Sequence, residues 1–181
     1  MNKYGLALKG GTKDKGQVAR PLGQSRRERV LLFQVGDGVF GIEMGSLAEA
    51  IYPKDLQFLS NPYSYCAKFF FRGQEIPVLC LNRLFGFPER GPDPSQKVLV
   101  TRKGGIEVGF LVDRILEMVE VDPEDIMPMS DMLTLLNPLF FRGVILRGEV
   151  PVTLLNPTHL AGADEVSYFY SQSNTAGNRS Q

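Results

Sequence analysis

The hydrophobic positions of this chain fall in short runs separated by turn residues, a pattern typical of a mainly β protein. The clearest case is a pair of apolar strands around Arg72-Gly73, where glycine can take the positive φ that a tight turn needs. Residues 144–156 repeat the order of this stretch: an apolar strand, Arg-Gly, an acidic residue, Pro-Val, and an apolar run that ends in Asn. We interpret the two stretches as one β unit used twice.

Each half of the chain also begins with a strand pair, 30–35 with 39–44 and 97–102 with 106–112. Gly41 and Gly109 occupy corresponding places in the return strands, and a glycine inside a strand predicts a bulge or a sharp bend. Segments 45–51 and 113–121 fit either a helix or a strand. Short helices are expected at 81–86 and 156–160, and a loop with one helical turn at 126–137.

About five short strands in each half predict two small antiparallel barrels, which bury a second apolar surface by packing against each other. The expected organisation is a disordered basic leader at 1–28, an ordered domain at 29–163 and a polar tail at 164–181, disordered from Ser171. Within the domain, the first barrel covers about 29–90 and the second about 96–163, with exchange of strands between them left open. Three prolines between 88 and 95 mark the linker.

Charge is unevenly spread along the chain, although the net charge is zero. Residues 1–29 carry eight basic and two acidic side chains, and the remainder carries twelve basic and eighteen acidic ones. Such a leader is either a solvated arm or a phosphate-seeking arm for nucleic acid, and the acidic body favours the first interpretation. The sequence has neither a run of about 20 apolar residues nor an apolar leader, so we expect a cytoplasmic protein.

The residues give no positive case for catalysis. His159 is the only histidine, so no Ser/His/Asp or Cys/His set can be built without it. The carboxylates between 122 and 125 fit a solvated turn, and Cys66 and Cys80 lie in or beside apolar runs, as reduced core cysteines do. We therefore expect no enzyme, no metal and no cofactor, while a weaker alternative is a barrel that binds a small molecule.

A binding role has better support. Residues 69–71 are three consecutive phenylalanines and 140–141 are two more, and alternation along a strand sends about half of them to each face. Either some of them line a groove or all are buried in the two cores. Arg72, beside the first row, is either a solvated turn residue or a recognition residue that makes forked hydrogen bonds.

Together these motifs resemble the CheW-like domain family of bacterial chemotaxis over residues 29–161. The segment from Phe71-Arg72-Gly73 through Pro77-Val78 to Phe85-Gly86 resembles the family's strongest signature. Phe40-Gly41-Ile42 and the Gly109–Asp113 segment resemble two further family segments, and the turn at 123–126 fits the part of the family pattern after them. The chain departs from the pattern at Cys80, Ala67 and Asn82, where the family commonly has Asp, Gly and Arg, and in its long leader.

The resemblance implies two intertwined five-stranded SH3-like antiparallel barrels with short helices and no catalytic activity. It implies an adaptor that couples the cytoplasmic tip of a methyl-accepting chemoreceptor to the regulatory domain of a CheA-type histidine kinase, at receptor arrays beneath the inner membrane. This chain is either a divergent member or one that serves a non-flagellar pathway such as surface motility. The main alternative function is a small-barrel nucleic-acid-binding protein that uses the basic leader.

The resemblance also suggests which residues bind. For the receptor, in a groove between the barrels, the expected residues are Arg72, Phe40, Ile42 and Phe71. For the kinase, at an apolar barrel end, they are Val144, Ile145 and Val152.

Overall fold

The computed structural model describes residues 27–60, 65–88, 91, 93–129 and 136–177, with side chains as far as Ser171. The expected disordered leader, apart from its last two residues, and the turn expected at Asn61-Pro62 lie outside this range. Within it, no helix is long and apolar enough to cross a membrane.

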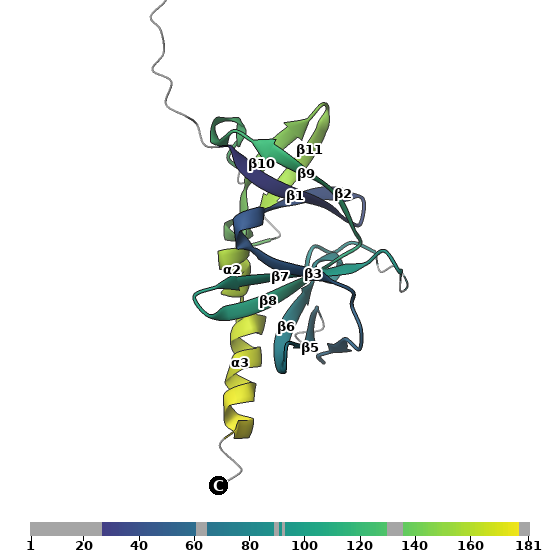
Figure 1. Ribbon diagram of the computed structural model, residues 1–181, viewed down its shortest axis with the longest axis vertical. Coiled ribbons are helices and arrows are strands. Elements are labelled where there is room, and N and C mark those ends of the chain that lie inside the picture. Colours follow the sequence, from purple (N-terminus) through teal and green to yellow (C-terminus); the bar gives the residue numbers. More distant parts are fainter. Residues whose placement is uncertain (1–26, 61–64, 89–90, 92, 130–135, 178–181) are drawn as a thin grey trace, which may run out of the picture.

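Two sheets form the body of the molecule, one above the other in Figure 1. Sheet A has five strands in the order β10 (Phe141–Arg147), β11 (Val150–Leu155), β2 (Gly38–Glu43), β1 (Glu28–Val35) and β9 (Arg114–Val121). Sheet B has six in the order β3 (Leu47–Ile51), β7 (Lys97–Lys103), β8 (Ile106–Val112), β6 (Gln74–Cys80), β5 (Cys66–Phe71) and β4 (Gln57–Phe58).

The two halves of the chain exchange strands. β1 and β2 pair with β9, β10 and β11 of the second half, whereas β3 to β6 pair with β7 and β8. The sequential division into 29–90 and 96–163 therefore does not describe the sheets. The mainly β class is confirmed, but the sheets are mixed, because β2 runs parallel to β11 and β6 parallel to β8. Pro77 and Pro151 each directly precede a parallel ladder, where a missing N–H leaves the ladder intact.

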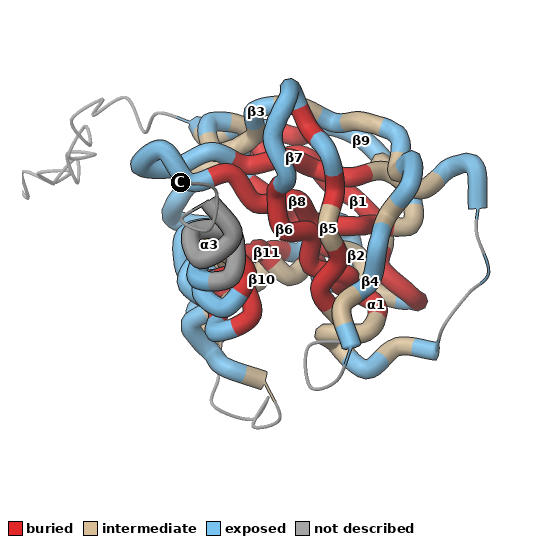
Figure 2. Tube along the Cα trace, turned by 90° about the horizontal axis from the view of Figure 1, so that it is seen from below, coloured by how far each residue is buried: buried red, intermediate tan, exposed pale blue. Residues whose placement is uncertain are grey.

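Both faces of the central strands β1, β6, β7 and β8 are buried over most of their length, which explains their nearly continuous apolar runs. One cluster fills sheet A's barrel around Val30 and Leu154, and a second fills sheet B's barrel around Val78 and Val98. The third and largest lies between the barrels and takes residues from both sheets, including Phe33 and Phe110. The buried segments accordingly meet in the middle of the body (Figure 2).

Gly41 and Gly109 were expected to mark bulges or bends, but the shifts in strand register lie at other residues. Both glycines instead allow close packing. A Cβ atom on Gly41 would lie 2.7 Å from Val30 Cγ1 and 2.8 Å from Leu154 Cδ2. One on Gly109 would lie 2.7 Å from Val98 Cγ1 and 2.8 Å from a Val78 methyl carbon. Each glycine therefore lets neighbouring strands fill the interior of its own barrel.

Short helices connect the strands: η1 (Met44–Ser46), α1 (Leu81–Leu84), η2 (Pro123–Asp125), η3 (Pro138–Phe140) and α2 (Pro157–Ala161). Segment 45–51, which fitted either a helix or a strand, forms η1 followed by β3, and segment 113–121 forms β9. The expectation of a polar tail at 164–181 was wrong in part, because helix α3 (Asp164–Gly177) begins there. Val166 and Phe169 are buried, and their three-residue spacing places them on one helix face; Ala163, directly before the helix, is buried as well.

A carboxylate holds the crossover from β8 in sheet B to β9 in sheet A. Asp113 Oδ2 accepts a hydrogen bond from Gly36 N at 2.8 Å, and Oδ1 accepts one from Asn82 Nδ2 at 2.6 Å. These bonds join the β1–β2 turn to α1. Asn82 Oδ1 is buried and has no hydrogen-bond partner among the described residues.

We predict that Gly41→Ala and Gly109→Ala each destabilise the protein by about 1–3 kcal/mol, because the added methyl group overpacks a barrel interior. The measurement is the free energy of unfolding in urea. Gly91→Ala is the matched control, since a Cβ atom there meets nothing within 4 Å. Equal stability of Gly41→Ala and Gly91→Ala would contradict the packing role.

Candidate docking faces

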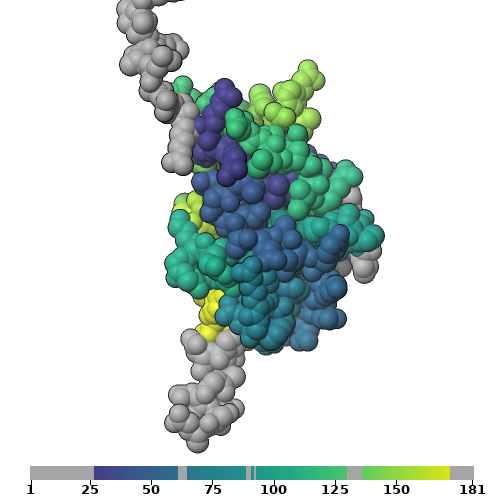
Figure 3. Space-filling model, viewed as in Figure 1, coloured from purple at the N-terminus to yellow at the C-terminus, as the bar shows by residue number. Residues whose placement is uncertain are grey.

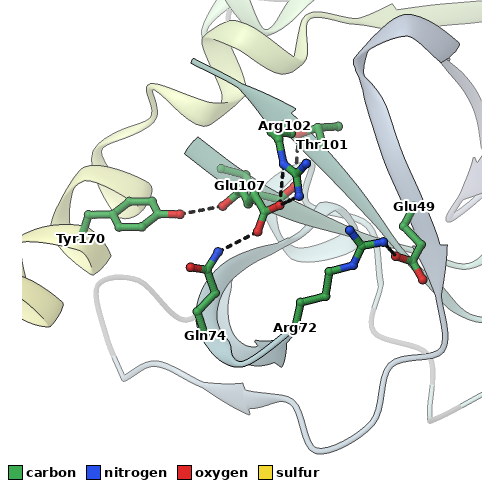
Figure 4. Close-up of polar contacts among 8 residues, drawn as sticks. Glu49, Arg72, Gln74, Thr101, Arg102, Glu107 and Tyr170 are labelled. Carbon is green, nitrogen blue, oxygen red and sulfur yellow. Dashed lines mark hydrogen bonds and ion pairs between the residues drawn. The ribbon is translucent and has the colours of Figure 1, made fainter. Parts of the chain in front are cut away.

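Arg72 lies exposed in the turn between β5 and β6. Arg72 and Gly73 both take the left-handed conformation, at φ 48° and 89°, as the expected tight hairpin turn requires. Arg72 Nη2 donates to Glu49 Oε2 on β3 at 2.7 Å (Figure 4). The guanidinium carbon lies 5.1 Å from the centre of the Phe71 ring. The turn, the ion pair and the ring contact therefore fix this arginine on the surface.

Sheet A's barrel contains the corresponding ion pair. Arg147 Nη2 on β10 lies 3.4 Å from Glu117 Oε1 on β9. Glu49 and Glu117 are 68 residues apart, as are Gly41 and Gly109, and each glutamate adjoins a register shift. We call each pair an arginine clasp: it joins the repeated hairpin to the edge strand of the same sheet.

The surfaces around the two clasps differ. The alanine face consists of Ala48, Glu49, Ala50 and Arg72, with both alanines exposed. The apolar face consists of Leu116, Glu117, Met118, Leu146, Arg147 and Val150. Its four apolar side chains are exposed by 42–58 %, and the β10–β11 hairpin projects at the end of the molecule in Figure 3. These exposed apolar side chains lie on β9 and on the β10–β11 hairpin, and Leu116 and Met118 alternate along β9 with Glu117.

Three of the four residues expected at the receptor are in the core. Phe40 is 8 % exposed, Ile42 0 % and Phe71 5 %. Phe40 and Ile42 belong to the cluster between the barrels, whereas Phe71 fills sheet B's barrel. Their expected surface position was wrong, and Arg72 alone of the four is exposed.

The residues expected at the kinase give a similar result. Ile145 and Val152 are buried in sheet A's barrel, so their surface position was also wrong. Val144 is half-buried and forms a β-bridge with Met127. Two exposed apolar residues lie close to them in sequence: Leu146, which follows Ile145, and Val150, two residues before Val152.

Sequence reasoning missed the glutamates and the flanking residues of both faces. The available signal was the 68-residue offset, which relates Glu49 to Glu117 as it relates Gly41 to Gly109. The phenylalanine rows divide unequally: Phe70 is 69 % exposed, whereas Phe69, Phe71 and Phe141 are buried.

The reactive side chains of the described residues are dispersed. His159 is exposed on α2, and no group of three His, Cys, Asp or Glu side chains in the described part of the chain could hold a metal ion. Cys66 and Cys80 are free and buried, in different clusters. Burial raises the pKa of the Cys66 thiol to about 11, so it stays protonated at neutral pH.

The fold is similar to that of a scaffolding protein. The crystal structure of TtCheW from Thermoanaerobacter tengcongensis matches with a TM-score of 0.66 and 18% identity, over 72% of this chain and 84% of that chain. The model of the CheW-like domain family matches residues 29–165, so the chain belongs to that family.

Two curated relatives carry the name Chemotaxis protein CheW. The protein of Helicobacter pylori (strain ATCC 700392 / 26695) is 26% identical over 145 residues, which cover 78% of this chain and 87% of the relative. The protein of Treponema pallidum (strain Nichols) is 21% identical over 143 residues, which cover 76% and 84%.

We predict that neither cysteine reacts with a thiol reagent such as Ellman's reagent at pH 8 while the protein is folded, because access to both is blocked and the Cys66 thiolate is disfavoured. Addition of denaturant should release both thiols. Immediate reaction of one thiol in the native protein would contradict the buried placement.

Proposed function

We propose that this protein is an adaptor without catalytic activity that couples the cytoplasmic tip of a chemoreceptor to the regulatory domain of a CheA-type histidine kinase. Membership of the CheW-like family supports a role in chemotaxis signalling. The observation that carries the two-partner proposal is the duplicated arginine clasp, because its two copies lie on surfaces of different chemistry. The proposed location is the receptor array beneath the inner membrane.

The alanine face is the proposed receptor site. Ala48 and Ala50 have short side chains, so the backbone of a receptor helix can approach β3 closely. Arg72 is held to β3 through Glu49, the residue between the two alanines, and can donate to a carboxylate or a backbone carbonyl of the helix. Small residues next to an ordered arginine suit the side of a helical coiled coil better than a flat apolar partner.

The apolar face is the proposed kinase site. The kinase regulatory domain, by the family resemblance, is itself CheW-like, so two barrel ends would meet. Leu146, Val150 and Met118 supply exposed apolar area, and burial of such area drives association. Val144 lies next to this surface and is half-buried.

Binding both partners at once would raise their effective concentration toward each other without any bond being made or broken. It would also couple receptor state to kinase state if the two bound states differ in free energy.

We predict that Arg72→Glu weakens binding to receptor tips by about tenfold or more, because it places a negative charge beside Glu49 and removes the donor. Stability should change by about 1 kcal/mol or less, as for an exposed ion pair. The measurement is a pull-down or titration with receptor-tip fragments. Arg147→Glu, at the other clasp, is the matched control and should leave receptor binding intact; an equal loss with both variants would argue against the assignment of faces.

Met118→Glu should weaken binding to the kinase regulatory domain by about tenfold or more and leave receptor binding unchanged, because the apolar contact would have to bury a charge. Calorimetric titration with each partner provides the measurement. Ala50→Glu, at the position 68 residues earlier, is the control and should show the opposite selectivity. Unchanged kinase affinity of Met118→Glu would remove the apolar face from the proposal.

A further inference from the structure

Helix α3 lies almost wholly beyond the family match, which ends at residue 165. It lies beside sheet B (Figure 1) and contacts two of that sheet's inner strands, β5 and β8. Val166 and Phe169 are buried, and the ammonium group of Lys68 on β5 lies 5.9 Å from the centre of the Phe169 ring. Helix α3 is thus packed against the sheet that carries the alanine face.

A specific hydrogen bond joins α3 to β8. Tyr170 Oη donates to the backbone oxygen of Glu107 at 2.7 Å. Burial raises the pKa of the Tyr170 phenol, which keeps the hydroxyl protonated as a donor.

Glu107 extends this connection to the hairpin that carries Arg72. Its carboxylate is buried, accepts from Arg102 Nε at 2.7 Å through Oε1, and accepts from Gln74 Nε2 at 2.7 Å through Oε2 (Figure 4). Gln74 pairs with Phe71 and so closes the two-residue turn that contains Arg72. Hydrogen bonds therefore join Tyr170 to Glu107 and Glu107 to Gln74, and the pairing of Gln74 with Phe71 closes the turn that contains Arg72.

We infer that Glu107, Gln74 and Tyr170 are positioning residues, through which α3 holds the β5–β6 turn in the conformation that presents Arg72 to a partner. This inference rests on the proposed receptor site. Arg72 has a positive φ that a non-glycine residue seldom adopts, so the turn needs support from its surroundings. A turn that is ordered before binding loses less conformational entropy when the partner docks.

The first test is hydrogen exchange of the free protein in the peptide that covers residues 71–75. Gln74→Met keeps the length of the side chain and removes the donor to Glu107, and Tyr170→Phe removes only the hydroxyl group that donates to Glu107 O. We expect about three- to tenfold faster exchange of the turn with Gln74→Met and a smaller increase with Tyr170→Phe. Gln57→Met, on the exposed strand β4, is the control. Unchanged exchange of the turn in both variants would overturn the inference.

The second test is rescue. Gln74→Glu combined with Glu107→Gln restores an amide–carboxylate hydrogen bond with the two roles reversed, so turn exchange should return toward the native rate relative to Glu107→Gln alone. A double variant as fast as the single one would overturn the inference. A merely destabilising effect of Glu107→Gln would not be reversed by the second change, and urea unfolding of both variants measures that effect.

Receptor-tip affinity then separates the two proposals. Gln74→Met should weaken it by about three- to tenfold and leave kinase affinity unchanged. Faster turn exchange with native receptor affinity would overturn the link to binding. If Gln74→Met and Arg72→Glu both bind the receptor tip with native affinity, the proposed receptor site itself is wrong. If Arg72→Glu loses receptor-tip binding while Gln74→Met keeps it, only the positioning role is wrong.

Discussion

Exchange of strands between the two halves is the constraint on which the rest of the structure depends. Each barrel is completed by strands from the other half through a parallel ladder, β11 with β2 and β6 with β8. Neither half can close its barrel alone, and the largest apolar cluster takes side chains from both sheets. The two barrels are therefore one folding unit. Gly41 and Gly109 serve this arrangement, because each lies where a parallel ladder crowds a barrel interior.

A consequence of this exchange is that surfaces on opposite barrels are held at a fixed separation. Asp113 reinforces the link at one crossover by joining the β1–β2 turn to α1. The duplicated unit then provides an arginine clasp on each barrel, and the residues around the clasps differ: alanines in one copy, leucine and methionine in the other. A scaffold with two similar but chemically distinct surfaces suits the binding of two different partners at once.

Much of this fold could be predicted from the sequence, because it depends on local signals. Gly73 marked the first hairpin turn, and the repeated Arg-Gly and Pro-Val segments marked the duplication. Strand exchange could not be derived in this way, because strand alternation does not say which distant strand is the partner. Short apolar runs also hid which strands have two buried faces, so Ile42 and Val152 were placed on the surface. Helix α3 was taken for a polar tail because few of its residues are apolar, although their spacing gives it one buried face.

The proposed adaptor holds two partners at once through separate faces. The most direct measurement is sedimentation velocity on receptor-tip fragment and kinase regulatory domain, with and without this protein. The account predicts a ternary species that forms only when all three are present and that contains both partners on one copy of the chain. Mutually exclusive binding, in which added kinase domain displaces the receptor tip, would contradict it.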